Sequence, residues 1–140
     1  VPMVTIAKGV CRGVLTGGNL SLISSSLGTP YEIDTKDKVL FIEEIGETPY
    51  RIDRMLLMIK QAGKLRACTG IILGAFTDCG APDSEESLTL HEVITELLLD
   101  EGKPILGAVQ CGHILPTLSL PLGVNVSMDA TNRTLRVLEY

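Results

Sequence analysis

The sequence predicts a mixed α/β domain, and three observations carry that prediction. Residues 39–42 and 70–75 are continuous apolar runs without polar alternation, which is typical of strands covered on both faces of a sheet. Each of these runs is followed by a segment with helical periodicity, and the chain closes with the pattern of a hairpin. A length of 140 residues fits one compact domain.

The first part of the chain is expected to contain a strand, a tight turn and a short helix. Residues 4–15 are rich in β-forming side chains and lead into Thr16-Gly17-Gly18-Asn19, where two glycines and an asparagine favour a turn. Asn19 can cap a helix over residues 20–27, because its side-chain oxygen can accept from free amides of the first turn. A polar loop then leads to the strand at 39–42.

Two longer helices follow from start signals and apolar spacing. Pro49 directly after Thr48 predicts a helix start, and Thr89 with Glu92 forms a capping box ahead of a helix that ends at Gly102. In the first helix, apolar residues recur at the spacing of one helical face: Ile52, Met55, Leu56 and Ile59.

The remaining segments are expected to be strands and loops. A loop over residues 77–87 follows the second buried strand, and residues 104–109 predict another short strand. Residues 118–128 and 135–140 have the pattern of a terminal hairpin around 129–132.

Composition excludes several classes of function. The net charge of −5 offers no basic footprint for nucleic acid, and 4% aromatic residues leave no platform for stacking bases. No apolar run approaches the roughly 18 residues of a membrane span, and no signal peptide is visible. The start at Val1-Pro2-Met3 is what a cut inside a longer polypeptide would leave.

Two adjacent carboxylates close the strand at 39–42. Burial disfavours a charged carboxylate without partners, so Glu43 and Glu44 are candidates for a function. The simpler interpretation is that they cap the following loop or pair with Arg51 and Arg54 on the next helix. Because side chains alternate along a strand, at most one of the two carboxylates should face any given site.

Of the two histidines, His113 is the better candidate for chemistry. It follows Cys111-Gly112 in a loop after a strand, whereas His91 lies in the first turn of an amphipathic helix and reads as a surface residue. A Glu and a His suggest a relay toward a nucleophile, for which Cys111 is one possibility. Cys111 and His113 could also be metal ligands, but no second cluster supplies the other positions of a zinc site.

Six motifs in register give the chain a strong resemblance to one family. These motifs are Gly17-Gly18-Asn19-Leu20, Gly28-Thr29-Pro30, Phe41-Ile42-Glu43-Glu44, Ile52-Asp53-Arg54, Gly70-Ile71-Ile72-Leu73-Gly74, and Gly112-His113 with Leu120-Pro121-Leu122-Gly123. With them the chain resembles the serine LD-carboxypeptidases and the related microcin-immunity peptidases across nearly its whole length.

This resemblance implies a role for the chain within a two-domain enzyme. Residues 1–140 correspond to the family's C-terminal domain, a swivelling-type β/β/α fold with a mixed sheet flanked by helices. By position, Glu43 resembles the triad glutamate and His113 the triad histidine. The nucleophilic serine is expected in an N-terminal domain absent from this chain, so the chain alone should be inactive. The family needs no metal or organic cofactor.

The family's substrates imply the partners and the location of the protein. Its murein enzymes remove the terminal D-alanine of cytoplasmic murein tetrapeptides during cell-wall recycling, and many members are homodimers. Its immunity peptidases instead cleave a peptidyl nucleotide antibiotic. Residues 41–54 look more like the murein branch, which is favoured, and residues 123–138 more like the immunity branch. A binding module that kept the fold without catalysis is the remaining alternative.

Overall fold

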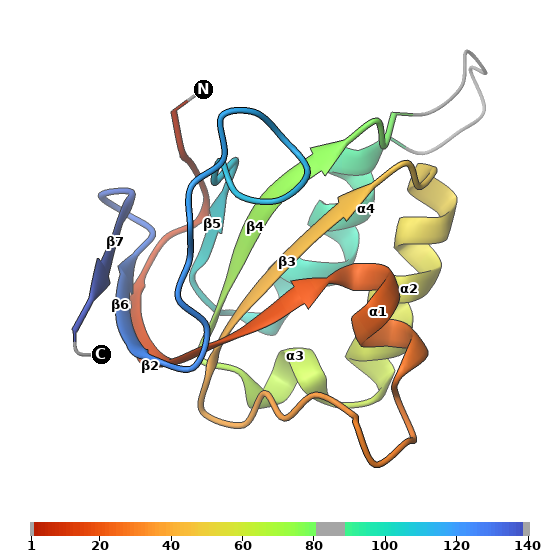
Figure 1. The fold of residues 1–140 in the computed structure, drawn as a ribbon, viewed down its shortest axis with the longest axis horizontal. Coiled ribbons are helices and arrows are strands. Elements are labelled where there is room, and N and C mark those ends of the chain that lie inside the picture. Colours follow the sequence, from red (N-terminus) through yellow and green to blue (C-terminus); the bar gives the residue numbers. More distant parts are fainter. Residues whose placement is uncertain (1, 81–88, 139–140) are drawn as a thin grey trace.

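The computed structural model describes residues 2–80 and 89–138, which form a curled, mixed sheet with helices packed against it (Figure 1). In these ranges the sheet has seven strands in the order β1-β5-β4-β3-β2-β6-β7. The neighbours from β5 to β2 are parallel, while β1 at one edge and β6 with β7 at the other are antiparallel. The strands are β1 (Val4–Ala7), β2 (Val10–Asn19), β3 (Val39–Ile45), β4 (Gly70–Thr77), β5 (Ile105–Gly107), β6 (Asn125–Asp129) and β7 (Thr134–Val137).

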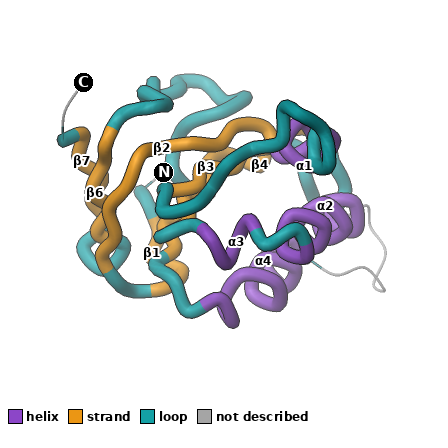
Figure 2. Tube along the Cα trace, turned by 90° about the horizontal axis from the view of Figure 1, so that it is seen from below, coloured by secondary structure: helices purple, strands orange, loops and turns teal. Residues whose placement is uncertain are grey.

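The helices gather on one face of the sheet, as the view in Figure 2 shows. They are α1 (Leu20–Ser25), α2 (Pro49–Gln61), α3 (Lys64–Ala67) and α4 (Leu90–Leu98), which continues into the 3₁₀ turn η1 (Leu99–Glu101). None of the helices in the described ranges is long and apolar enough to cross a membrane.

Two hydrophobic cores lie on opposite faces of the sheet, and the central strands contribute to both. Leu40 and Ile42 of β3 pack with the helices, whereas Val39 and Phe41 pack on the other face against residues that include Leu120. The predicted burial of residues 39–42 on both faces is therefore confirmed. The same holds for β4, where Ile71 and Leu73 alternate with Ile72.

The predicted helix starts are confirmed, with one difference in how they are capped. The Asn19 side chain accepts from the Leu22 amide, and Thr89 forms the full capping box with Glu92. Thr48 stands at the N-cap of α2, but its hydroxyl makes no capping hydrogen bond.

The predicted turn at residues 16–19 is wrong, because these residues complete β2. Gly17 pairs with Phe41 and Asn19 with Glu43 in the parallel ladder to β3. A Cβ on Gly17 would lie 1.9 Å from the carbonyl oxygen of Phe41, so the glycine lets two backbones approach closely. The glycines that indicated a turn are therefore explained, at Gly17, by the close approach of two strands.

Other expectations need smaller corrections. The expected strand over 4–15 is split between β1 and β2. Of the expected strand over 118–128, only the last part is a strand: β6 covers Asn125–Asp129 and ends one residue beyond the predicted end. Residues 118–124 instead cover the sheet face opposite the helices, where Leu120 and Val124 join the second core. The part of the 77–87 loop from residue 81 onward, and residues 139–140, lie outside the described residues.

We predict that Gly17→Ala destabilises the domain more than Gly18→Ala. Both glycines have positive φ, +136° and +146°, so both variants carry backbone strain of roughly 1–3 kcal/mol. Only Gly17 also meets backbone atoms, which should cost about 1–3 kcal/mol more, since a Cβ at Gly18 finds nothing within 4 Å. Urea denaturation of both variants measures the difference, and equal losses would contradict the close-approach explanation.

Candidate active site

The candidate site lies at the carboxyl ends of the parallel strands, where binding residues of open α/β sheets usually gather. Asn19 ends β2, and Glu43 and Glu44 stand near the end of β3. Because Asn19 and Glu43 are partners in the parallel register, their side chains meet without any help from a loop. His113 comes from the segment that follows β5.

The structure brings the two predicted residues together. Nδ1 of His113 lies 2.9 Å from Oε2 of Glu43, within hydrogen-bonding distance. Glu43 is buried, with 6% of its surface exposed, whereas the His113 side chain is 56% exposed. The carboxylate can therefore fix the ring through Nδ1 while much of the imidazole remains open to solvent.

Main-chain hydrogen bonds hold the loop that carries His113 against the end of β4. The Val109 amide donates to the Leu73 carbonyl, and the Ala75 amide donates to the Cys111 carbonyl. Farther along, the Thr77 hydroxyl donates to the carbonyl of His113 itself at 2.7 Å. The histidine backbone is thus attached to the strand that neighbours β3, which fixes its position relative to Glu43.

Gly112 allows this loop to rest directly on the carboxylate. A Cβ at this position would lie 2.9 Å from Oε2 of Glu43 and 3.1 Å from its Cβ, and the residue has a φ of +125°. Both the space and the backbone conformation therefore favour glycine immediately before the histidine.

Glu44 points to the helix side and is held by donors rather than by the expected arginines. Its carboxylate accepts from the Ser21 amide and hydroxyl, from the Ile45 amide and from Asn19, at 2.7–3.0 Å. Burial acts to raise the pKa of Glu44, but these hydrogen bonds outweigh it and lower the pKa below its usual value.

Of the simpler interpretation, the pairing of Glu43 and Glu44 with Arg51 and Arg54 is wrong, whereas Glu44 does accept a hydrogen bond from the Ile45 amide that follows it. Arg51 pairs with Glu47, which lies four residues earlier and just before α2, and both arginines lie near the ring of Tyr50. The two carboxylates instead accept hydrogen bonds from Asn19, Ser21 and Ile45 at the strand end.

Asn19 is a member of the site, although the sequence indicated it as a turn residue, a helix cap and part of a family motif and not as a partner of the carboxylates. Its Nδ2 donates to Oε1 of Glu43 at 3.1 Å and to Oε1 of Glu44 at 3.0 Å. Alternation along β3 does direct only Glu43 to His113, yet both carboxylates reach this one amide. The signal that could have revealed it is parallel pairing of two strands that end in polar residues.

The other candidates for chemistry are less suited to it. Burial raises the pKa of the Cys111 thiol, the Thr117 hydrogen bond lowers it in part, and the charge of Glu43 raises it further, so the nucleophilic thiolate is disfavoured. His91 is exposed on α4, as expected. Within residues 2–80 and 89–138, no group of three or more His, Cys, Asp or Glu side chains could hold a metal ion.

Serine hydroxyls near the site are already engaged in local structure. Those of Ser24, Ser25 and Ser26 each donate to a backbone carbonyl three residues earlier. Such back-bonding hydroxyls do not resemble a nucleophile on a strained turn.

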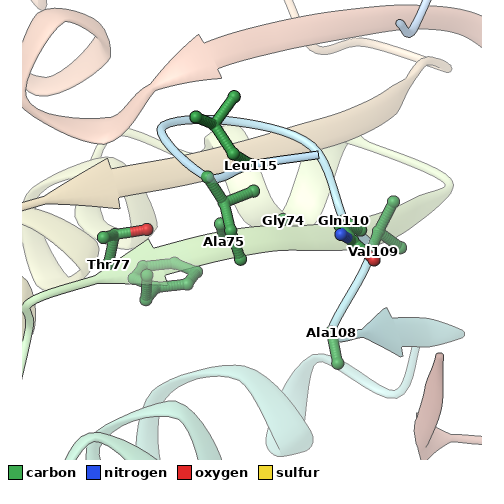
Figure 3. A pocket seen from close by; sticks show the side chains of 9 residues that line it. Gly74, Ala75, Thr77, Ala108, Val109, Gln110 and Leu115 are labelled. Carbon is green, nitrogen blue, oxygen red and sulfur yellow. The ribbon is translucent and has the colours of Figure 1, made fainter. Parts of the chain in front are cut away.

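Open space adjoins the histidine. A shallow hollow of about 590 Å³ is lined by His113, Gly112, Thr77 and Thr117 together with Ile114 and Leu115. A neighbouring apolar pocket of about 470 Å³ shares Thr77, Ile114 and Leu115, and Figure 3 shows its lining from the end of β4 and the loop after β5. A bound group could therefore reach the ring through this open space.

Comparison with known proteins identifies the family. Residues 12–128 match the family described as LD-carboxypeptidase C-terminal domain. The chain belongs to this family. A relative from Bacillus subtilis (strain 168), described as a probable murein peptide carboxypeptidase, is 42% identical over 133 residues, which are 95% of this chain and 42% of the relative.

Solved structures agree with this membership and with the mixed α/β fold. The microcin C7 self-immunity protein MccF in its wild-type apo state superposes with a TM-score of 0.85 at 27% identity, covering 99% of this chain and 41% of MccF. Muramoyltetrapeptide carboxypeptidase from Oxalobacter formigenes gives 0.84 at 26%, covering 96% and 49%. The chain thus spans less than half the length of these proteins.

We predict that Glu44→Gln destabilises the domain by about 1–3 kcal/mol at neutral pH, because the new NH₂ group must face two of the four donors, whichever carboxylate oxygen it replaces. The folded-state pKa of Glu44 is depressed, so its contribution to stability is complete above the ordinary value of 4.5 and is lost as the pH falls through the folded-state pKa. Urea denaturation across acid pH should show the wild type and the variant converging.

Glu96→Gln is the matched control for this prediction, because Glu96 is exposed on α4 and should change stability by less than about 0.5 kcal/mol. A constant gap between wild type and Glu44→Gln at all pH values would show that the charge of Glu44 contributes nothing.

Proposed function

We propose that this chain supplies the Glu and His of a Ser-His-Glu triad in a serine LD-carboxypeptidase. The substrate in this proposal is a murein tetrapeptide, cleaved at the L,D-amide bond to its terminal D-alanine in the cytoplasm. The observation that carries the proposal is the contact between buried Glu43 and half-exposed His113, with a 2.9 Å separation of Oε2 and Nδ1. It is the geometry a carboxylate needs to orient a general base.

The proposed mechanism assigns one task to each residue. With Nδ1–H of His113 donating to Glu43, Nε2 is left as the basic nitrogen and takes the proton of a serine hydroxyl as its oxygen attacks the amide carbon. Glu43 stabilises the imidazolium that forms. His113 then gives the proton to the amine of D-alanine as the C–N bond breaks. Water, activated by the same nitrogen, hydrolyses the acyl-enzyme and restores the serine.

The serine and the oxyanion hole are proposed to lie in an N-terminal domain of the full-length protein. Relatives such as the Bacillus subtilis protein are more than twice as long as the segment matched here, so they have room for such a domain. Without a serine and an oxyanion hole only residual catalysis remains, and we expect the isolated chain to be inactive.

The murein substrate is favoured by the 42% identity to the Bacillus subtilis relative, whose description names murein peptides. A second candidate is cleavage of a peptidyl nucleotide antibiotic, which is supported by the TM-score of 0.85 to MccF. A non-catalytic binding module is the third. The hollow beside His113 is lined by residues that do not distinguish the two substrates, so the choice requires kinetics.

In the full-length protein, we expect Glu43→Gln to lower kcat for D-alanine release from a murein tetrapeptide by roughly 10³–10⁴-fold, because the ring loses its orienting charge. His113→Ala should lose at least as much. His91→Ala, the only other histidine in the sequence and exposed on α4, should leave the rate unchanged.

An unchanged rate in both site variants would refute the triad. Faster turnover of an aminoacyl sulfamoyl adenosine than of the tetrapeptide would assign the protein to the antibiotic-cleaving branch. Absence of any hydrolysis, together with binding of the tetrapeptide, would support the binding module.

A further inference from the structure

Two adjacent buried carboxylates at the end of β3 share one partner. Glu43 is 6% exposed and Glu44 is 2% exposed. Like charges this close repel each other in a medium of low dielectric, and each also loses hydration. Both carboxylates have an Oε1 within 3.1 Å of Nδ2 of Asn19. The two hydrogens of one amide group therefore satisfy one oxygen on each carboxylate.

The orientation of the Asn19 amide is fixed by its own partners. The Leu22 backbone amide, which can only donate, lies 3.2 Å from Oδ1. Oδ1 must therefore face α1, and the NH₂ group must face the carboxylates. An amide flipped by 180° would place an oxygen against two carboxylates and an NH₂ group against a donor.

Glu44 fixes the other end of this arrangement. Its carboxylate also accepts from the Ser21 amide and hydroxyl and from the Ile45 amide. Those donors belong to the first turn of α1 and to β3, which are both part of the packed fold. Glu44 is thus a rigid acceptor that holds Nδ2 of Asn19 in place.

We infer that Asn19 is a positioning residue for the Glu43–His113 pair, and this inference rests on the proposed function. Asn19 fixes Oε1 of Glu43, so that Oε2 is directed at Nδ1 of His113. A free Glu43 side chain could rotate about its last bonds and leave the ring. The chain of contacts runs from Ser21 through Glu44, Asn19 and Glu43 to His113, and only its last member is half exposed.

Three substitutions separate this role from helix capping. Asn19→Ser and Asn19→Asp keep an N-cap oxygen but remove the NH₂ donor, and Asn19→Asp also adds a third negative charge. Asn19→Ala removes both the cap and the donor. If Asn19 acts only as a cap, Asn19→Ser should behave like the wild type; if it positions Glu43, Asn19→Ser should be impaired as Asn19→Ala is. Asn19→Asp is expected to be impaired in either case, because its charge repels the two carboxylates.

The kinetic test uses the full-length protein. We expect Asn19→Ser and Asn19→Ala to lower kcat by a similar factor, roughly 10–100-fold, with little change in KM, because misplacing a catalytic group by about 1 Å has effects of this size. Asn19→Asp should be at least as impaired. Wild-type kcat in Asn19→Ser with a loss only in Asn19→Ala would overturn the inference, since the cap alone would then matter.

A spectroscopic test on this chain separates failure of the inference from failure of the proposed function. The Nδ1 proton of His113 should give a downfield NMR resonance that Glu43→Gln abolishes and that Asn19→Ser weakens through faster exchange with water. His91→Ala should leave it unchanged. An unchanged resonance in Asn19→Ser would overturn the positioning role.

If the resonance responds as expected but Glu43→Gln leaves kcat intact, the triad is refuted while the positioning of Glu43 by Asn19 is supported. The two claims can therefore fail separately.

Discussion

Burial of two neighbouring carboxylates is the constraint on which the candidate site depends. A carboxylate withdrawn from water must find donors or become protonated, and Glu43 and Glu44 lie on opposite sides of one strand end. The partners of the two carboxylates include the backbone amides of Ser21 and Ile45, the side-chain amide of Asn19 and the ring of His113. Positive side chains take no part among these contacts, so the acids are balanced by dipoles and by the imidazole.

The parallel pairing of β2 with β3 makes this arrangement possible. The backbone of Gly17 lies so close to Phe41 that a Cβ could not be accommodated. Because glycine has none, the two strand ends can approach closely in the register that pairs Asn19 with Glu43. That register places Asn19 beside Glu43 and begins α1 at the next residue. One short stretch of chain therefore ends a strand, caps a helix and supplies the central donor of the site.

Much of the fold could be predicted because its signals are local. The apolar runs of β3 and β4, the capping box at Thr89 and the N-cap at Asn19 depend on spacing and side-chain chemistry within a few residues. The strand character of Gly17 could not be read in this way, because it depends on how closely a second strand approaches. Residues 118–124 do not form the predicted strand; apolar residues such as Leu120 and Val124 pack a loop against the sheet with the same spacing that a strand would show.

In the candidate site, too, features with local signals could be predicted, whereas contacts that depend on the folded chain could not. Glu43 and His113 stood out as an acid closing a buried strand and a histidine after a glycine, and their meeting over 70 positions of sequence is a tertiary fact. The resemblance to a family supplied the pairing that spacing alone left open. Asn19 stood in one of the family motifs and at a helix start, but its contact with the two acids could not be predicted, because only the folded register brings them within reach of its amide.

The attachment of the histidine loop to β4 has a consequence for how this surface can diversify. Val109, Ala75 and Cys111 hold the loop through main-chain groups, which every residue type except proline can supply. The side chains at the loop tip, such as Leu115 with 90% of its surface exposed, contribute little to holding the loop on β4. Substitutions at the loop tip can therefore change the shape and polarity of the surface that contacts a substrate, while the imidazole of His113 stays in position. Substrate specificity can change in this way without loss of the Glu43–His113 pair.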